Sequence, residues 1–166
     1  MRRSAVVRAS FSADGALVVT ASVDETAGVW DARSGKELRK LEGHRGSVES
    51  AQFSADGERV VTASWDETAR VWEAKSGKEL SKLEGHSAGV VSARFSPDGE
   101  RVVTASADRT ARVWEVQSGA LLETLSLSLP DMFDLEDPLQ TIVFDPPSNL
   151  LVALNDQNAR AYDVGR

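Results

Sequence analysis

A 42-residue internal repeat constrains this 166-residue chain more than any other feature. The stretch 11–52 recurs at 53–94 without insertion or deletion, and 30 positions are identical. A third copy begins at Phe95 and keeps the register through 119, and a weaker fourth copy follows with a one-residue deletion. Repeats of this length are single supersecondary units that bury their apolar faces only by stacking on one another. The chain is therefore expected to fold as one array of similar units.

Each copy divides into short strand-like segments separated by turn residues. In the second copy, strands are expected at 48–54, 59–64, 69–73 and 78–83, because these segments are β-branched or alternate polar with apolar residues. Turn signals such as Asp56-Gly57 separate them. No segment between turns is long enough for a helix of the usual three turns. The predicted fold class is all-β, with antiparallel strands.

A motif recurs in phase in each well-kept copy: Gly-His, then a Ser-x-Asp turn about 20 residues later, then Val-Trp and an acid. The second copy has Gly43-His44, Ser64-x-Asp66 and Val71-Trp72-Glu73, and the third has Gly85-His86, Ser106-x-Asp108 and Val113-Trp114-Glu115. This pattern resembles the WD40 repeat family, and the resemblance covers essentially the whole chain. It implies a WD40-type β-propeller, here a partial ring of four blades of antiparallel strands.

The chain is expected to form one propeller region over 1–166. The expected blades span about 4–41, 42–83 and 84–125, with a degenerate fourth at about 139–164. An insertion at 126–138 mixes acids with apolar residues and lies between the last two blades. It is either a surface loop of a decaying repeat or a loop that docks a partner.

The family resemblance implies a hydrogen-bonded tetrad of His, Ser or Thr, Asp and Trp in each blade. The chemistry fits, since indole donates, hydroxyl donates and accepts, imidazole links two partners and carboxylate accepts. The assigned members are His44, Ser64, Asp66 and Trp72 in the second blade, His86, Ser106, Asp108 and Trp114 in the third, and an incomplete Ser22, Asp24 and Trp30 in the first. Thr62 and Thr104 lie on the same strand face and could replace the serines.

The first and fourth copies depart from this pattern. Arg2 stands one period before His44, so the first blade lacks its histidine. The fourth copy has Leu154 where the hydroxyl is expected, Tyr162 in place of Trp, and no Gly-His. The fourth blade is therefore predicted to be the least stable.

The position just before the turn aspartate varies while its neighbours are nearly constant, so the fold does not dictate it. In WD40 propellers this position projects onto the face where partner peptides dock, together with the start of the inner strand. The candidate partner-binding residues are Trp65, Val23 and Ala107 at the varying position, and Arg45, Ser47 and Glu49 near the inner strand. Trp65 either contacts a partner, as interface Trp residues often do, or packs on an adjacent loop.

The sequence favours a non-catalytic protein–protein interaction scaffold, alone or as the sensor part of a larger signalling chain. The alternative is a propeller-based enzyme or small-ligand-binding module. Both histidines occupy the same repeat position, whereas a catalytic site normally breaks internal symmetry. The turn acids Asp14, Asp56 and Asp98 occur once per turn, without the dense spacing of a calcium loop. No catalytic residue, cofactor or metal is expected.

Charge and composition narrow the partners to other proteins or peptides. A net charge of -7 with scattered basic residues argues against nucleic acid, and no apolar run is long enough to span a membrane. With no cysteine and no secretory signal, a cytoplasmic location is expected. Four blades of this family would cover about half a circle, so the chain is expected either to pair as a homodimer or to need the missing remainder of the propeller.

Overall fold

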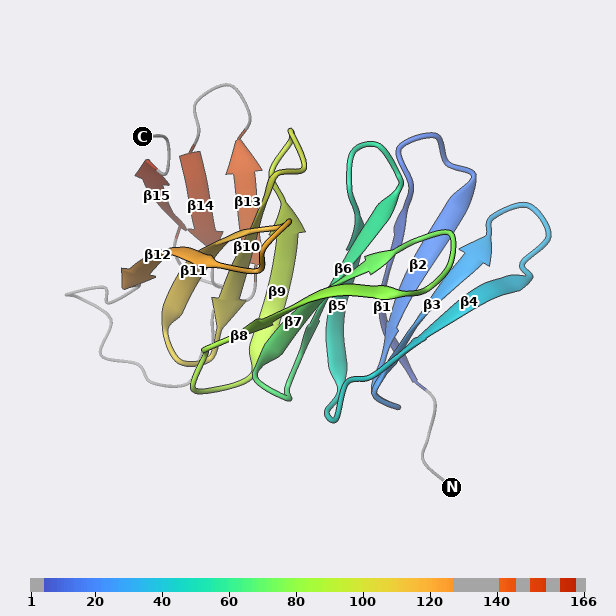
Figure 1. Ribbon diagram of the computed structural model, residues 1–166, viewed down its shortest axis with the longest axis horizontal. Helices are drawn as coiled ribbons and strands as arrows, with labels where there is room; N and C mark the ends of the chain where they lie inside the picture. The colour runs from blue at the N-terminus through green and yellow to red at the C-terminus, as the bar shows by residue number, and fades with distance from the viewer. Residues whose placement is uncertain (1–4, 127–140, 146–149, 155–158, 164–166) are drawn as a thin grey trace.

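The computed structural model describes residues 5–126, 141–145, 150–154 and 159–163, and side-chain burial over 5–126. The first three repeats each form an antiparallel four-stranded sheet (Figure 1). The first blade consists of β1 (Val6–Phe11), β2 (Leu17–Ser22), β3 (Thr26–Asp31) and β4 (Glu37–Glu42). The second consists of β5 (Val48–Phe53), β6 (Arg59–Ser64), β7 (Thr68–Glu73) and β8 (Glu79–Glu84). The third consists of β9 (Val90–Phe95), β10 (Arg101–Ser106), β11 (Thr110–Glu115) and β12 (Leu121–Ser126).

A three-stranded sheet follows within the range expected for the fourth blade. Its strands are β13 (Thr141–Asp145), β14 (Leu150–Leu154) and β15 (Ala159–Asp163), paired in that order. Apart from Ser126 at the end of β12, the expected insertion at 126–138 lies outside the described residues. None of the described residues lies in a helix, so none forms a helix able to cross a membrane. The predicted all-β class is confirmed.

The sheets stand side by side, with the first strand of each on the inside (Figure 1). The inner strand β5 contacts β1 on one side and β9 on the other, and β9 in turn contacts β13. Each of the first three sheets then runs outward in chain order to its fourth strand, which is an edge. This is the arrangement of a partial propeller.

Adjacent sheets share their cores. One apolar cluster joins Val19 of the first blade to Val60 and Trp72 of the second. The next cluster joins Val61 of the second blade to Trp114 of the third. Val60 and Val61 are neighbours on β6 and both are fully buried, so this sheet is covered on both faces. That double burial explains why 59–64 reads as a continuous apolar strand and does not alternate.

Candidate functional site

A chain of side-chain hydrogen bonds crosses the second blade. His44 Nδ1 lies 2.8 Å from Asp66 Oδ2, and His44 Nε2 lies 2.7 Å from Thr62 Oγ1. Trp72 Nε1 donates to the same Thr62 oxygen over 2.9 Å. His44, Thr62 and Trp72 are buried, and the indole and imidazole rings meet edge to face with centroids 6.2 Å apart. The four side chains link the strands β6 and β7 to the segment before β5.

Ser64 is not a member of this network, which corrects the assignment made from the sequence. Its hydroxyl donates to the Gly46 carbonyl over 2.9 Å and accepts from the Asp66 N–H at 3.1 Å. The reason is strand register: Trp72 pairs with Val60, far from the end of β6 where Ser64 lies, so the indole reaches Thr62. Threonine, the alternative on the same strand face, takes the hydroxyl position.

The third blade repeats this arrangement. His86 Nδ1 lies 2.7 Å from Asp108 Oδ2, His86 Nε2 lies 2.7 Å from Thr104 Oγ1, and Trp114 Nε1 donates to Thr104 over 2.9 Å. Ser106 is again outside the network, because its hydroxyl donates to the Ala88 carbonyl and accepts from the Asp108 N–H.

The first blade keeps part of the network. Trp30 Nε1 donates to Thr20 Oγ1 over 2.8 Å, so threonine replaces the assigned serine here too. Ser22 accepts from the Asp24 N–H at 3.3 Å, and the Asp24 carboxylate accepts from the Thr26 hydroxyl. Arg2, which stands where the histidine is expected, lies outside the described residues.

Electrostatics fix the direction of the hydrogen bonds in the third blade. Burial lowers the pKa of His86, which keeps the ring neutral. Burial raises the pKa of Asp108, but hydrogen bonds from Thr110, His86 and the Ser87 N–H outweigh it and lower this pKa to about 2. A neutral ring therefore donates from Nδ1 to a charged carboxylate and accepts the Thr104 hydroxyl at Nε2. Both ring nitrogens of His86 therefore have hydrogen-bond partners within the blade.

Three of the candidate partner-binding residues lie at the Asp66 end of the second-blade network. The Arg45 N–H donates to Asp66 Oδ2 over 3.0 Å, and the Trp65 N–H donates to the Ser47 carbonyl over 3.0 Å. These contacts bring Arg45, Ser47 and Trp65 together, and we call these three residues the turn surface. The Ser47 hydroxyl donates to the Glu49 carboxylate at 2.6 Å, which orients both side chains at the start of β5.

Trp65 is 49% exposed and also packs against the next blade. A Cβ placed on Gly89, which precedes β9, would lie 2.2 Å from the Trp65 ring, so the ring rests directly on this backbone. The interpretation that Trp65 packs on an adjacent loop is therefore confirmed, and half of its surface is open to solvent. Its contact with a partner stays a prediction. At the equivalent positions Val23 is exposed and Ala107 is half-buried.

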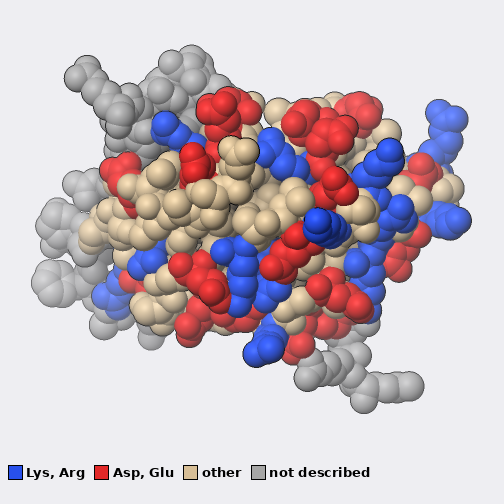
Figure 2. Space-filling model, in the orientation of Figure 1, with Lys and Arg blue, Asp and Glu red and all other residues tan. Residues whose placement is uncertain are grey.

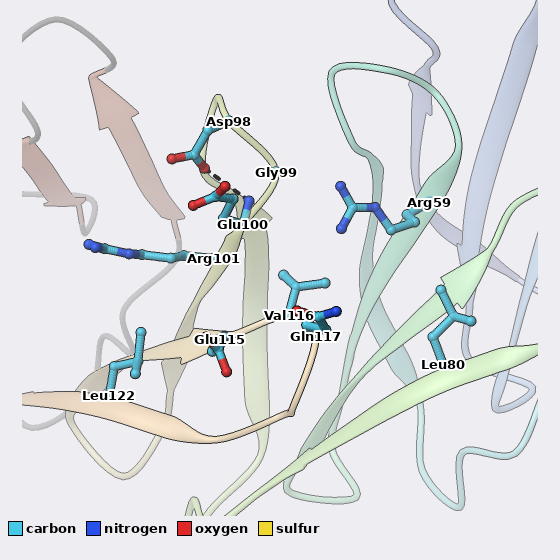
Figure 3. A pocket seen from close by; sticks show the side chains of 10 residues that line it. All are labelled: Arg59, Leu80, Asp98, Gly99, Glu100, Arg101, Glu115, Val116, Gln117 and Leu122. Carbon is cyan, nitrogen blue, oxygen red and sulfur yellow. Dashed lines mark hydrogen bonds between the residues drawn. The ribbon is translucent and has the colours of Figure 1, made fainter.

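The motifs did not reveal a hollow of about 820 Å³ between the second and third blades (Figure 3). Its lining residues are Arg59, Leu80, Asp98, Gly99, Glu100, Arg101, Glu115, Val116, Gln117 and Leu122. The Asp98 carboxylate accepts from the Glu100 N–H at 2.9 Å, as the dashed line in Figure 3 shows. Arg59 lies against Gly99 and over the Phe95 ring. The Asp98 carboxylate stabilises the turn in which it lies. The exposed Leu80 and Leu122 come from two different outer strands, β8 and β12, so their spacing in the sequence does not predict the hollow.

The turn acids also have structural partners. Asp56 accepts from the Ser54 hydroxyl and from the Glu58 N–H, as Asp14 does from Ser12 and the Ala16 N–H. Within the described residues, no three His, Cys, Asp or Glu side chains are grouped so that they could hold a metal ion. The carboxylates of these turns shape the hairpins.

Comparison with protein families gives three consecutive matches. The family model described as WD domain, G-beta repeat matches residues 3–31, 35–73 and 77–115, which together make up more than half of the chain. A comparison with curated proteins gave no match.

Proposed function

This chain belongs to the WD40 repeat family, whose members generally bind other proteins, and from that premise we propose that it is a non-catalytic scaffold presenting its turn surface to a protein or peptide partner. Its place as the sensor part of a larger signalling chain belongs to the same proposal. The observation that carries the proposal is Trp65, a large apolar side chain half exposed at a position where the other blades have Val23 and Ala107. Leaving a Trp ring in water forfeits the gain of burying it, and Trp is enriched among interface hot spots.

The engagement of every polar group in the buried networks supports a non-catalytic role. Each histidine nitrogen of the second and third blades has a partner, and the threonine hydroxyl between His and Trp is buried. A nucleophile and base working on a substrate need an exposed face. Within this proposal the networks hold the blades rigid, and the exposed turns do the binding.

Charge supports a protein partner over nucleic acid. The net charge is -7, and in the face seen in Figure 2 acidic and basic side chains are interspersed without a broad basic area. Nucleic-acid affinity depends on clustered Lys and Arg. We propose that the partner is neither nucleic acid nor membrane, and that binding takes place in the cytoplasm, in keeping with a chain that has no cysteine.

The first blade supports a second kind of contact. Val6 is 60% and Phe11 68% exposed, whereas Val48 at the repeat position of Val6 is fully buried against the preceding blade. Together with Trp30 these residues form the side of the sheet that an adjacent blade covers elsewhere. We propose that another blade packs here, supplied by a second copy of the chain or by a further part of the propeller. A light-scattering mass that stays at one chain at every concentration would refute the second-copy arrangement.

The turn surface is tested with peptides selected for binding from a random library displayed on phage. Trp65→Ala should weaken binding of the selected peptides at least tenfold while leaving the melting temperature nearly unchanged. Leu80→Ala, which removes a similarly exposed apolar side chain on the outer strand β8, is the matched control and should bind normally. Equal binding by Trp65→Ala, or its strong destabilisation, would show that Trp65 belongs to the scaffold.

A further inference from the structure

The outer strands of the first and second blades differ at one position beside the next blade. Arg39 on β4 pairs with Val29 of β3. Ser81 on β8 pairs with Val71 of β7, so the two residues occupy the same place in the repeat. Because the same strand forms with either side chain, the fold does not dictate this residue. What changes with it is the contact between one blade and the next.

Arg39 bridges the first and second blades. Its Nε donates to the Lys75 carbonyl of the second blade over 2.7 Å, and its Nη1 donates to the Leu38 carbonyl of its own strand. A Cβ placed on Gly77 would lie 3.7 Å from both Cβ and Cδ of Arg39, so the stem of this side chain rests on the turn 73–78. The guanidinium group therefore lies between two backbone carbonyls, one from each blade.

The turn that receives this guanidinium group recurs in the third blade. In the second blade it is closed by a hydrogen bond from the Gly77 N–H to the Glu73 carbonyl at 2.8 Å. In the third blade the Gly119 N–H closes the turn before β12 in the same way, over 2.9 Å. Gln117 of this turn stands at the repeat position of Lys75. Its carbonyl is therefore the counterpart of the acceptor in the second blade.

Ser81 lies over this turn of the third blade but is too short to make the same bridge. Its hydroxyl donates to the Val116 carbonyl over 3.4 Å. A Cβ placed on Gly119 would lie 3.7 Å from the Ser81 Cβ, which is the distance found for Arg39 over the turn of the second blade. The serine therefore keeps the contact that the arginine stem makes and supplies no guanidinium group.

The hollow of about 820 Å³ between the second and third blades lies where this bridge is missing. Its lining includes Leu80 and Gln117, whose carbonyls correspond to the two acceptors of Arg39. Figure 3 shows Val116 and Gln117 between Leu80 on one side and Leu122 on the other. The two leucines are 47% and 53% exposed, so the hollow offers apolar walls as well as carbonyl acceptors.

The charges around the hollow favour a cation over an anion. Three carboxylates and two guanidinium groups belong to the residues that line it. One of these guanidinium groups, that of Arg59, lies against the Gly99 backbone and over the Phe95 ring. It is also 3.6 Å from the Asp56 carboxylate, so part of its charge is already balanced. A cation beside the Gln117 carbonyl therefore enters surroundings with an excess of negative charge.

We propose that this hollow binds a partner peptide through an arginine side chain, which takes the place that Arg39 has between the first and second blades. The guanidinium group donates to the Leu80 and Gln117 carbonyls, and apolar residues next to the arginine pack on Leu80 and Leu122. Arginine fits better than lysine, because its planar group holds several donors in a fixed fork and is more weakly hydrated than an ammonium group. The site lies at the other end of β6 from the turn surface and is independent of the partner that binds there.

The repeat itself supplies the variant that tests this site. Ser81→Arg restores the residue of the first blade and places the chain's own guanidinium group in the hollow, so it should fold and exclude the peptide. Ala13→Arg, in an exposed turn of the first blade, adds the same charge away from the hollow and is the matched control. Leu80→Ala removes an apolar wall of the hollow without adding a charge.

The probe is the peptide acetyl-Leu-Arg-Leu-amide, added to the isotope-labelled chain while the backbone amide shifts are followed by NMR. In a second peptide citrulline replaces arginine, which keeps the length and planar end of the side chain and removes its charge. The amides of the residues that line the hollow report on this site, and those of Arg45, Ser47 and Trp65 report on the turn surface.

The expected result is a saturable shift of the amides around the hollow with the arginine peptide, and clearly weaker binding of the citrulline peptide, because hydrogen bonds from a charged donor are stronger. Ser81→Arg should abolish the saturable shift. Leu80→Ala should raise the Kd by about threefold or more, because it removes apolar contact area. Ala13→Arg and Trp65→Ala should bind the arginine peptide as the unmodified chain does.

The proposal would be overturned by the absence of a saturable shift in the unmodified chain, by an unchanged shift in Ser81→Arg, or by equal binding of the citrulline peptide. Shifts confined to the turn surface would also overturn it, since the peptide would then bind at the other end of β6. Should Ser81→Arg fail to fold, undiminished affinity in Leu80→Ala would overturn it equally.

Discussion

The first and second blades have similar sequences and different surroundings. Val48 is fully buried, whereas Val6 at the same repeat position is 60% exposed. Trp72 is 2% exposed and belongs to the cluster shared with the first blade, whereas Trp30 is only half-buried and belongs to neither of the shared clusters. The residues are the same, and the difference is a neighbouring sheet that covers them.

This comparison shows where the stability of such an array lies. The second sheet buries one face against the first blade and the other against the third. The apolar interfaces between neighbouring blades therefore stabilise the array, as in other repeat proteins whose units contact only their neighbours. The second blade also has a complete hydrogen-bond network, which the first lacks because it has no histidine within the described residues.

The largest effect expected from this difference is at the repeated tryptophan. Trp72→Ala should lower the free energy of unfolding by roughly 3 to 5 kcal/mol, because it empties a buried site and leaves Thr62 without its donor. Trp30→Ala is the matched control and should cost clearly less, since part of its ring is already in water. Urea unfolding followed by circular dichroism measures both. Equal losses would mean that the neighbouring blade contributes little.

The strand positions could be predicted well from the sequence, because each copy repeats the same order of strand-like segments and turn residues. The second-copy prediction of 59–64 coincides with β6, and 69–73 differs by one residue from β7 at Thr68–Glu73. The hydroxyl of the network was harder to assign, because Thr62 and Ser64 share a strand face and both are buried. Only the cross-strand pairing of Trp72 with Val60 decides between them. The hollow at Arg59 and Leu80 could not be predicted, since it depends on how two blades sit side by side.

The pH dependence of stability tests whether the complete hydrogen-bond networks, which contain a histidine, respond to pH differently from the incomplete network of the first blade. Because the pKa of His86 is lowered in the folded state, the unfolded state takes up a proton at a higher pH than the folded state does. The contribution of His86 to stability is therefore fully present above about pH 6.5 and is lost as the pH falls below that value. The lowered pKa of Asp108 acts in the same direction at lower pH, with stability lost as the pH falls from about 4 towards 2. Urea midpoints measured between pH 8 and pH 3 should show both declines.

His86→Gln and Asp108→Asn separate the two declines. The first variant should flatten the dependence near pH 6, and the second should weaken the loss below pH 4. Thr26→Val in the first blade, which removes a hydrogen bond to Asp24 but touches no histidine, should leave the decline near pH 6 unchanged. A decline near pH 6 that persists unchanged in His86→Gln would show that His86 is not its source.

The smallest expected effect concerns an ion pair that the second blade has and the third has lost. Arg70 Nη1 is paired with Glu79, whereas the third blade has Leu121 at the repeat position of that acid, and the equivalent Arg112 lies over the Trp114 ring. The Nε of both arginines is buried without a hydrogen bond. Register supports the equivalence, because Trp72 pairs with Glu79 as Trp114 pairs with Leu121.

Leu121→Glu should therefore raise the free energy of unfolding by up to about 1 kcal/mol, since it pairs a partly buried guanidinium and removes a side chain that is 45% exposed. The neighbouring Leu122→Glu, also on the exposed part of β12, is the control for added negative charge and should give no gain. Raising the salt concentration should reduce the gain of Leu121→Glu, because the new pair is partly open to solvent. A stabilisation of equal size in both variants would mean that general charge on the outer strand is responsible, and that Arg112 does not need the partner that Arg70 has.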